Sequence, residues 1–427
     1  MQSDTSTTAA THSIPTPPAS PTTTPQPVSN AAAPADIVVA GALAVDFSCD
    51  YHPFPTTTSA IDPVPQTSNP AAITQSLGGV AHNIAKAAHL LGSSVRLYSA
   101  VGNDLSGRAA VSQLEEEGME TTGISMLDKP ARTAQYVAVN NKNKELALAM
   151  ADMSILENIP EQITADLASK LFEKTATPPK VFVADANWSS PALHTWLRAA
   201  HSASTLTIFE PVSTAKALRI FPLSTSTPPS THPHPLASII TPNTHELTAL
   251  HAHAASTSLF STPPWFRTID ALGIPSSGLR VPLSITTTPS LVDAGIPQQA
   301  IKLLPFFPTT LTKLGPQGVL MTRILEDDAE ELRDEEERQY VLARRSNGDV
   351  ESGVGGLYVR LFPVEKVLGP EEVVSVNGIG DTFCGALAVG LSKGRKVQDV
   401  VSFAQKAAGL SLRCRESVSG ELKGLMM

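Results

Sequence analysis

Apolar residues along the chain recur with two different periods, which predict two kinds of element. Continuous apolar runs are typical of strands covered on both faces, and such runs occupy 37–41, 95–101, 181–185, 206–210 and 239–240. Between them apolar positions recur at helical spacing, as in 82–91, where the helical stripe stops at Gly92. This alternation predicts an α/β fold in which helices flank a mostly parallel central sheet as a three-layer sandwich. Ligands of such sheets collect at the carboxyl ends of the strands.

One stretch instead alternates apolar and polar residues, as a strand with one exposed face does. Residues 133–139 and 145–150 alternate on either side of Asn140-Asn141-Lys142-Asn143, which predicts an antiparallel hairpin. We expect the segments 46–77 and 131–150 to form a small β lid over a site. An exposed hairpin of this kind could also form the interface of a homodimer.

Composition divides the rest of the chain. Residues 1–34 are almost entirely Thr, Ser, Pro, Ala and Gln, which predicts a disordered tail ahead of one folded domain at 35–427. Stretches rich in Pro, Ser and Thr predict surface insertions at 222–236 and 255–290, the second with apolar residues that can pack locally. A third insertion, 326–352, begins with the run EDDAEELRDEEER, which we expect to be solvated and mobile.

The charge pattern narrows the possible partners. The acidic run holds nine acids and two arginines, so a net charge of −7 out of the chain's −9 arises there and the remainder is nearly neutral. No basic stripe suggests nucleic-acid binding, and no apolar run approaches the roughly 20 residues needed to cross a membrane. Cys49, Cys384 and Cys414 are scattered without metal or disulfide spacing, and no signal-peptide pattern precedes them. We therefore expect a cytoplasmic protein.

The chemistry is concentrated in the segment from Ser375 to Leu387. The valines at 373, 374 and 376 predict the end of a strand, and apolar residues at helical spacing predict a helix from Thr382. The backbone N–H groups at the start of a helix lack partners and attract anions, and glycine allows an anion to approach closely. Asp381 would then lie beside a bound phosphate, although a glycine turn before a capped helix explains the same residues structurally. The segment matches neither a P-loop nor G-x-G-x-x-G, and phosphoryl transfer fits it best.

Two separated motifs resemble one family. The segment Ser375–Leu387 resembles the C-terminal signature of the ribokinase-like (PfkB) carbohydrate kinases, and Gly78-Gly79-Val80-Ala81-His82-Asn83-Ile84-Ala85 resembles their N-terminal signature. The resemblance covers roughly residues 36–415. Segments that resemble pseudouridine kinases in particular are 133–153, 184–187, 211–216 and 403–405.

The resemblance implies roles for individual residues. It makes Asp381 the catalytic base and gives the anion hole to Gly378, Ile379 and Gly380. The implied substrate-binding residues are Asp46, which we place at the end of the first strand, and Gly78, Gly79, Asn83, Thr133, Asp152 and Asn187. The implied nucleotide and magnesium residues are Asn243, Glu246, Lys216, Gly315 and Gly318, with Glu246 reaching the metal through water. Without the family, Asn243 and Glu246 are also a good start for a helix.

The activity implied is ATP-dependent phosphorylation of the 5′-hydroxyl of a nucleoside, pseudouridine first of all. Its cofactors would be ATP and Mg²⁺, with a monovalent cation as a further candidate, and a separate pseudouridine-5′-phosphate glycosidase could share the pathway. Alternatives are another sugar or nucleoside kinase, ribokinase-like or adenosine kinase-like, or a catalytically impaired nucleoside-binding homologue.

Three departures from the family pattern bear on activity. Asn377 stands where threonine is common, and Glu210 stands where aspartate is usual. Ile379 replaces a small residue, and isoleucine disfavours positive φ. If the anion turn requires positive φ at Ile379, the turn is strained.

Overall fold

The computed structural model describes residue 1 and residues 34–53, 61–172, 177–222 and 229–427. The predicted tail and the centre of the 222–236 insertion therefore lie outside the described residues. The part from Pro34 to Met427 is one compact unit, and it contains every element named below.

A large sheet forms the centre of this unit. Within the described ranges it has ten strands, in the order β13-β14-β12-β11-β10-β9-β8-β1-β4-β5. The strands from β5 to β11 are parallel, and β12, β14 and β13 continue the sheet in antiparallel pairing. Their bounds are β1 Ile37–Ala40, β4 Val95–Gly102, β5 Ile124–Leu127, β8 Val181–Asp185, β9 Leu206–Glu210, β10 Ile239–Ile240, β11 Thr309–Lys313, β12 Val319–Leu325, β13 Val341–Arg344 and β14 Gly356–Phe362. The mostly parallel central sheet predicted from the apolar runs is confirmed.

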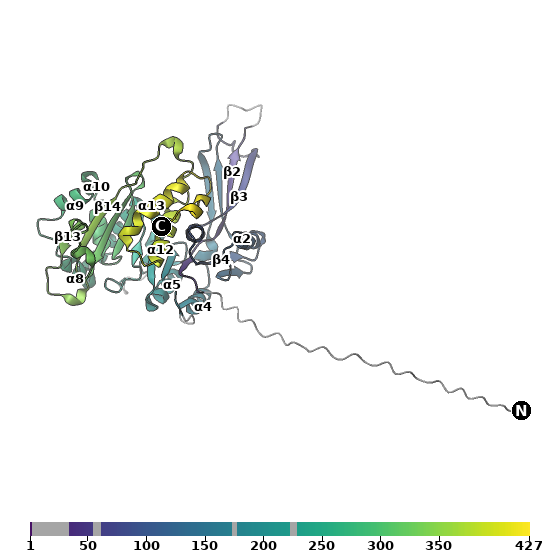
Figure 1. Cartoon of the computed structure of the whole chain (residues 1–427). Coiled ribbons are helices and arrows are strands. Elements are labelled where there is room, and N and C mark those ends of the chain that lie inside the picture. The colour runs from purple at the N-terminus through teal and green to yellow at the C-terminus, as the bar shows by residue number, and fades with distance from the viewer. Residues whose placement is uncertain (2–33, 54–60, 173–176, 223–228) are drawn as a thin grey trace. The chain divides into compact units, whose positions relative to one another are not determined.

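A smaller sheet stands at one side of the large one (Figure 1). Its order is β3-β2-β6-β7, with bounds β2 Ala44–Tyr51, β3 Ala71–Gly78, β6 Ala134–Asn140 and β7 Leu146–Asp152. Strands β6 and β7 pair antiparallel, which confirms the predicted hairpin. Strand β2 joins this hairpin to β3, because it pairs parallel to β6 and antiparallel to β3.

Helices cover both faces of the large sheet. Alternate residues of β1 enter two separate cores, Val38 and Ala40 one of them, Ile37 and Val39 the other. One core is closed by α1 Val80–Leu90, α2 Leu105–Glu116, α12 Ile379–Ser392 and α13 Val397–Leu412. The other is closed mainly by α4 Glu161–Phe172, α5 Ser190–Ser202, α7 Thr244–Ser256 and α11 Ile296–Leu303. Burial of β-branched and aliphatic side chains on both faces explains the continuous apolar runs in the sequence.

Shorter elements connect these layers. The short α-helices are α3 Ser154–Glu157, α6 Thr214–Ala217, α8 Pro263–Ala271, α9 Arg280–Thr286 and α10 Pro289–Asp293. The 3-10 turns are η2 Leu218–Ile220, η3 Leu259–Ser261, η4 Gly315–Gln317, η5 Glu330–Leu332, η6 Arg338–Tyr340, η7 Val350–Ser352, η8 Pro370–Glu372 and η9 Gly420–Gly424. The predicted insertion 255–290 is thus largely helical, and Trp265 of α8 is buried in the core.

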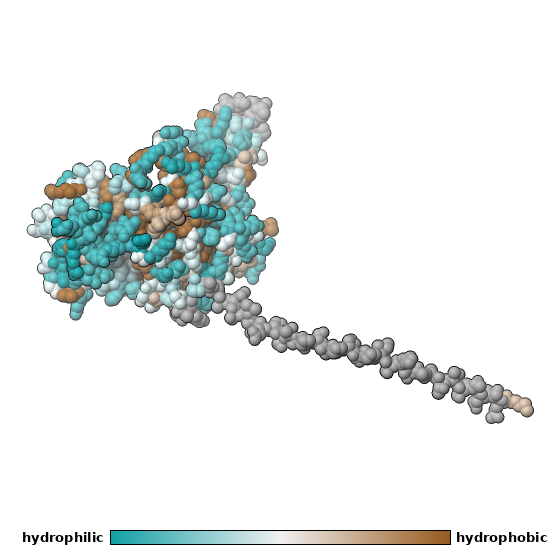
Figure 2. All heavy atoms as spheres, in the orientation of Figure 1, coloured by the Kyte–Doolittle hydropathy of each residue, from teal (hydrophilic) through white to brown (hydrophobic). Residues whose placement is uncertain are grey.

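The distribution of hydrophobic and hydrophilic residues on the surface follows the arrangement of the two sheets. In the view of Figure 2 the large-sheet part is mostly hydrophilic, and hydrophobic residues gather toward the middle, between it and the small sheet. None of the helices in the described ranges combines the length and the apolar composition that crossing a bilayer requires. The three cysteines are unpaired.

The valines before the glycine turn do not form the strand that we predicted. Residues 373–377 have no strand partner, and Val374 and Val376 are 52% and 71% exposed. The N–H groups of Val374 and Ser375 donate instead to the carbonyl oxygen of Leu412, at 2.8 and 3.3 Å. β-branched composition was misleading here, because a strand also needs a neighbour with which to pair.

Most of the acidic run is exposed, as the prediction of a solvated segment requires, but two of its acids are docked against the fold. Glu331 is buried, and its Oε1 accepts hydrogen bonds from Arg323 at 3.1 Å and from Gln398 at 2.8 Å. Glu337 accepts from Arg360 at 2.8 Å. Arg323 lies on β12, directly before the run, whereas Arg360 on β14 and Gln398 on α13 lie 23 and 67 residues from their partners, so the pattern of the run itself could not reveal them.

We expect Glu331→Ala to lower the free energy of unfolding by about 1–3 kcal/mol, because it leaves the buried amide of Gln398 and the partly buried guanidinium of Arg323 without their acceptor. Glu335→Ala, which removes an exposed carboxylate from the same run, is the matched control and should change stability by less than about 0.5 kcal/mol. Urea unfolding of the three proteins measures both values. Equal stability of the two variants would show that the run is not docked.

Candidate active site

The glycine turn lies directly before α12. Gly378 has φ 73°, in the left-handed region, and a Cβ there would overlap the carbonyl oxygen of Ser417. Glycine is therefore required for both conformation and space. Ile379 is the first residue of the helix and does not have positive φ. The strain considered for Ile379 does not arise, because the left-handed position falls on Gly378.

The start of α12 presents several backbone donors. Thr382 is the first residue to donate within the helix, to the carbonyl oxygen of Gly378 at 2.8 Å. The N–H groups of Ile379, Gly380 and Asp381 precede this bond and belong to the unpaired group at a helix N-terminus. The positive end of the helix dipole lies at the same place, so an anion would be stabilised there.

Asp381 meets the N-terminal motif across the fold. The Asn83 side chain, on α1, donates from Nδ2 to Oδ2 of Asp381 at 2.8 Å. Burial raises the pKa of Asp381 to about 7; the Asn83 hydrogen bond opposes the rise and the charge of Glu210 adds to it. A carboxyl group with this pKa can accept a proton near neutral pH and release it again. The structure thus brings together two of the predicted site residues that are 298 positions apart.

The second glycine pair joins the small sheet to α1. Gly79 has φ 93°, and a Cβ there would overlap the carbonyl oxygen of Ala42. A Cβ on Gly78 would overlap the carboxylate of Asp46, so this carboxylate lies directly against the turn. Burial raises the pKa of Asp46 to about 6.

Asp46 does not end the first strand, contrary to our placement. Strand β1 stops at Ala40, and Asp46 is inside β2, opposite Ser76 of β3. The chain leaves the large sheet at Gly41, where any side chain would overlap the carboxylate of Asp185. It then enters the small sheet, which carries Asp46 toward the Gly78-Gly79 turn.

Asn243 and Glu246 form a complete capping box at the start of α7. The Asn243 Oδ1 accepts from the N–H groups of His245 and Glu246, both at 2.9 Å, and Glu246 Oε2 accepts from the N–H of Asn243 at 2.8 Å. Burial and then the charge of Glu210 raise the pKa of Glu246. The two side chains therefore cap the helix, as the structural explanation of this motif predicted. A role in magnesium binding would be additional to capping.

The structure also reveals a buried ion pair that we did not predict. Lys313 ends β11, and its Nζ lies 3.0 and 2.9 Å from the two carboxylate oxygens of Glu210 at the end of β9. Thr241 donates to the same carboxylate at 2.6 Å. Only half of the signal was available, because Glu210 ends the predicted strand 206–210 but no strand was predicted at 309–313. Strand order, which the sequence does not give, decides that they meet.

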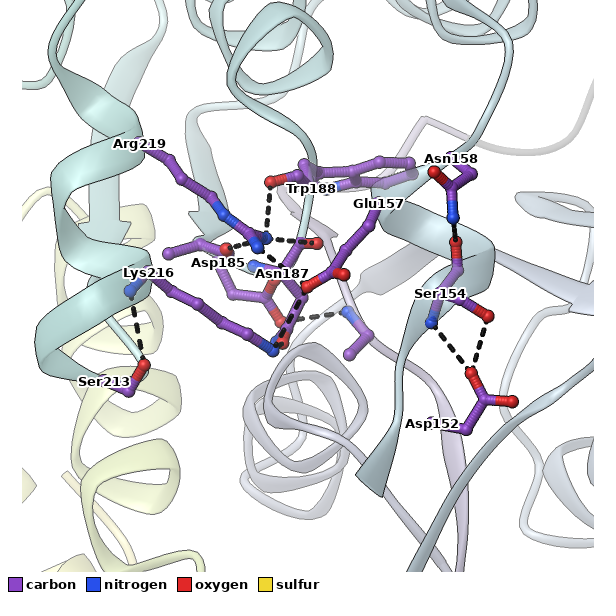
Figure 3. Close-up of polar contacts among 12 residues, drawn as sticks. Asp152, Ser154, Glu157, Asn158, Asp185, Asn187, Trp188, Ser213, Lys216 and Arg219 are labelled. Atoms are coloured by element: carbon purple, nitrogen blue, oxygen red, sulfur yellow. Dashed lines mark hydrogen bonds and ion pairs between the residues drawn. The ribbon is translucent and has the colours of Figure 1, made fainter. Parts of the chain in front are cut away.

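A second polar network surrounds the end of β8 (Figure 3). Asp185 is fully buried and accepts from the N–H groups of Ala42, Ala81 and Asn187, at 2.9, 3.0 and 2.8 Å. Burial raises its pKa, and these backbone hydrogen bonds oppose the rise. Lys216 reaches across from α6, and its Nζ donates to Asn187 Oδ1 at 2.7 Å. The predicted residues Asn187 and Lys216 therefore contact each other.

Arg219 completes this network. Its Nη1 donates to the carbonyl oxygens of Ala186, Asn187 and Trp188, each at 3.1 Å, and its Nη2 donates to Glu157 at 2.7 Å. The guanidinium thus holds three carbonyl oxygens of the turn after β8 in place (Figure 3).

The side chains of Thr133 and Asp152 form hydrogen bonds with other residues of the protein. The Thr133 hydroxyl is buried and donates to Asp104, the N-cap of α2, at 2.7 Å. Asp152 pairs with Arg132 at 2.7 Å and accepts from the Ser154 hydroxyl at 2.6 Å, and these contacts lower its pKa to about 2. Within the described part of the chain, neither residue forms a hydrogen bond with Asp381. Their part in substrate binding stays a prediction.

Gly315 and Gly318 form the turn between β11 and β12, two residues beyond Lys313. Both have positive φ, 60° and 100°. A Cβ on Gly318 would overlap the carbonyl oxygen of Phe362 and lie 2.9 Å from Nε2 of Gln405, on α13. The turn therefore packs against α13, the helix that follows α12 in the chain.

The layered sheet, the small second sheet and the anion turn define the class of ribokinase-like kinases. Solved structures with the same architecture include the ribokinase of Cryptococcus neoformans var. grubii in complex with ADP, with a TM-score of 0.58 and 17% identity over 91% of this chain and 99% of that one. The Arabidopsis thaliana ribokinase complexed with ribose and ATP has a TM-score of 0.58 and 13% identity, over 91% and 97% of the two chains. At these identities the likeness shows the fold.

The family model described as pfkB family carbohydrate kinase matches residues 35–259 and 354–423. The chain therefore belongs to the pfkB family of carbohydrate kinases. Kinases of this fold generally use ATP with Mg²⁺. The stretch 260–353, which includes Lys313 and the acidic run, lies outside the match.

Curated relatives point within the family. The chain is 32% identical over 401 residues to the pseudouridine-metabolizing bifunctional protein of Schizosaccharomyces pombe, covering 92% of this chain and 48% of that protein. It is 30% identical over 225 residues to the pseudouridine kinase of Arabidopsis thaliana, covering 52% of each chain. The pseudouridine kinase of Escherichia coli is 32% identical over 154 residues, which cover 36% of this chain and 46% of that one. The chain thus spans about half the length of these relatives.

Proposed function

We propose that this kinase transfers the γ-phosphate of ATP to the 5′-hydroxyl of a nucleoside, and that the nucleoside is pseudouridine. The observation that carries the proposal is the 2.8 Å hydrogen bond between Asn83 and Asp381. It joins the helix after the Gly78-Gly79 turn, which we assign to the sugar, to the turn that we assign to the phosphate. A hydroxyl of a sugar bound at the first turn would reach the carboxylate beside the second.

The reaction then needs few protein groups. The 5′-oxygen of the substrate attacks the γ-phosphorus, an O–P bond forms, and the bond from that phosphorus to the bridging β–γ oxygen breaks to release ADP. The proton of the hydroxyl passes to Asp381. The N–H groups at the start of α12 stabilise the charge on the transferred group, which is most of what phosphoryl transfer requires.

Sugar recognition is assigned to the residues around the Gly78-Gly79 turn. In the described part of the chain the carboxylate of Asp46 has no hydrogen-bond partner, so it is available to sugar hydroxyls. Release of the Asn83 amide from Asp381 would let it both donate to and accept from the ribose. We assign Asn187 to the opposite side of this site, because Asp185 ties its turn to Ala81 of α1. Lys216, which donates to Asn187, stays assigned to the nucleotide.

Magnesium fits the acidic residues on the nucleotide side. The described residues contain no group of three metal-ligating side chains, which suits an ion that keeps most of its waters. Glu246 would hold such waters with the carboxylate oxygen that the capping bond leaves free, and the metal would neutralise phosphate charge. Gly315 and Gly318 would border the nucleotide.

The choice of pseudouridine is supported by the names of the relatives at 30–32% identity. Another nucleoside or ribose is the alternative within the same mechanism. One reason to consider a catalytically impaired homologue, strain at Ile379, does not apply, because Ile379 does not have positive φ. We also propose a cytosolic location and a functional link to a pseudouridine-5′-phosphate glycosidase that consumes the product.

We further propose a homodimer through the small sheet, whose two faces differ. Ile73, Cys49, Val139 and Leu148 lie opposite one another in register across all four strands, and so share one face. On this face Ile73, Leu148 and Met150 are 66%, 51% and 64% exposed. Asp46 is on the other face. An exposed apolar row of this kind marks an interaction surface.

A substrate panel tests the activity. Measured by ADP release with Mg²⁺-ATP, turnover should be fastest with pseudouridine and slower with uridine, adenosine and ribose. Asp381→Asn should lower kcat by about 10²- to 10⁴-fold, because the base is lost, while calorimetry shows nucleoside binding within a few-fold of the parent. Absence of turnover with all four compounds would refute the proposed function.

The pH dependence tests the role of Asp381. Only the ionised carboxylate accepts a proton, so kcat/KM should fall as pH drops below about 7. The Asn83 hydrogen bond lowers the pKa of Asp381, so Asn83→Ala should move this limb of the profile to higher pH. Lys86→Ala changes the same helix at a residue that contacts Glu117 instead, and should leave the limb in place. A limb unmoved by Asn83→Ala would contradict the assignment of the base.

Light scattering tests the dimer. Ile73→Asp should shift the protein to a monomer, because it places a charge in the apolar row. Val281→Asp, at an exposed apolar residue of α9, is the control and should leave the assembly unchanged. A parent protein that is monomeric at micromolar concentration would exclude this interface.

A further inference from the structure

We infer that Lys313 binds the phosphate being transferred, and that Glu210 holds its ammonium in place beside the anion turn. This inference rests on the proposed kinase activity and adds a cation to a turn that otherwise offers only backbone donors. Lys313 lies in the stretch that the family model does not match.

The position of the ammonium carries the inference. A Cβ built on Gly380 would lie 3.0 Å from Lys313 Nζ, its nearest neighbour apart from the adjacent residues and the backbone of its own helix. Gly380 is the middle residue of the three whose N–H groups begin α12. The cation therefore lies against the backbone that faces the anion, and the absence of a side chain at residue 380 lets it come that close.

The surroundings keep this cation charged. Burial by itself would lower the pKa of Lys313, but the charges of Glu210 and Glu246 outweigh it and raise the pKa. Glu210 is buried beside it and holds Nζ with both carboxylate oxygens. Glu210 is itself fixed by the Thr241 hydroxyl at 2.6 Å. The ammonium thus has a defined position before a phosphate arrives, so little reorganisation is needed when it does.

The charge of the site calls for such a cation. Four carboxylates lie in this region: the charge of Glu210 raises the pKa of both Glu246 and Asp381, and the charge of Asp185 raises that of Asp381. A polyphosphate brought to it meets an excess of negative charge. Lys313 is the basic side chain that acts on both Glu246 and Asp381, so it is placed to offset that repulsion together with the metal.

A purely structural role is the competing explanation. Strand β10 lies between β9 and β11, so the ion pair also joins two strands that are not neighbours. Two single substitutions separate the roles, because each breaks the same ion pair and only one removes the cation. Lys313→Met removes the ammonium, whereas Glu210→Gln keeps it beside a neutral side chain of the same shape.

Calorimetric binding of AMP and of Mg²⁺-ATP, without nucleoside so that no transfer occurs, is the test. The parent protein should bind ATP more tightly than AMP. Lys313→Met should weaken ATP binding by about 10- to 100-fold, the value of a charge-assisted hydrogen bond, and leave AMP binding nearly unchanged. Glu210→Gln should keep the preference for ATP. The double variant, which leaves no unpaired buried charge, should lose the preference even if Lys313→Met alone fails to fold.

Each result is decisive. If the double variant still prefers ATP to AMP, Lys313 does not bind the phosphate. The same conclusion follows if Glu210→Gln loses the preference for ATP as fully as Lys313→Met does. In either case turnover of the parent protein shows separately that the proposed kinase activity stands. A parent protein that binds ATP no better than AMP would overturn both this inference and the placement of the phosphate at the turn.

Discussion

Burial of carboxylates at one edge of the large sheet is the constraint on which the rest of this site depends. Removal of a carboxylate from water is costly unless hydrogen bonds or an opposite charge replace the solvent. Each buried carboxylate has a different set of partners that offsets this cost. Asp185 takes three backbone N–H groups, Glu210 takes the ammonium of Lys313, and Asp381 has a single amide, that of Asn83. Asp381 is thus left with a pKa near neutrality, which suits a group that must accept and release a proton.

Glycine makes this crowding of charge possible. At two places the carboxylate of one segment occupies the space where the side chain of another would be, and at a third place an ammonium lies 3.0 Å from that space. The pairs are Gly41 with Asp185, Gly78 with Asp46 and Gly380 with Lys313. Each pair joins two elements that are distant in sequence. The glycines therefore permit close contact between charged groups as well as the sharp turns for which such residues are usually noticed.

Much of this arrangement could be predicted from local pattern. The strand 181–185 and the helix that follows the Gly78-Gly79 turn are where their apolar residues indicate, because burial on one or two faces leaves a period in the sequence. The resemblance assigned Asn83 to the sugar and Asp381 to the base, but it did not predict the hydrogen bond between them. Lys313 was missed because its partner is set by strand order, to which no local period corresponds. The docking of Glu331 was missed for a related reason, since its partner Gln398 lies on α13, 67 residues away.

The central claim is that the turn at Gly378 directs a phosphoryl group from ATP onto a nucleoside hydroxyl held by the Gly78-Gly79 turn. Phosphorus NMR of the parent protein with Mg²⁺-ATP and pseudouridine tests this directly, because it observes the phosphorus atom as it changes partners. The account predicts the appearance of ADP together with an equal amount of a phosphate monoester whose signal is split by the two protons of the 5′-carbon. Unchanged ATP, or ADP accompanied only by inorganic phosphate, would contradict it.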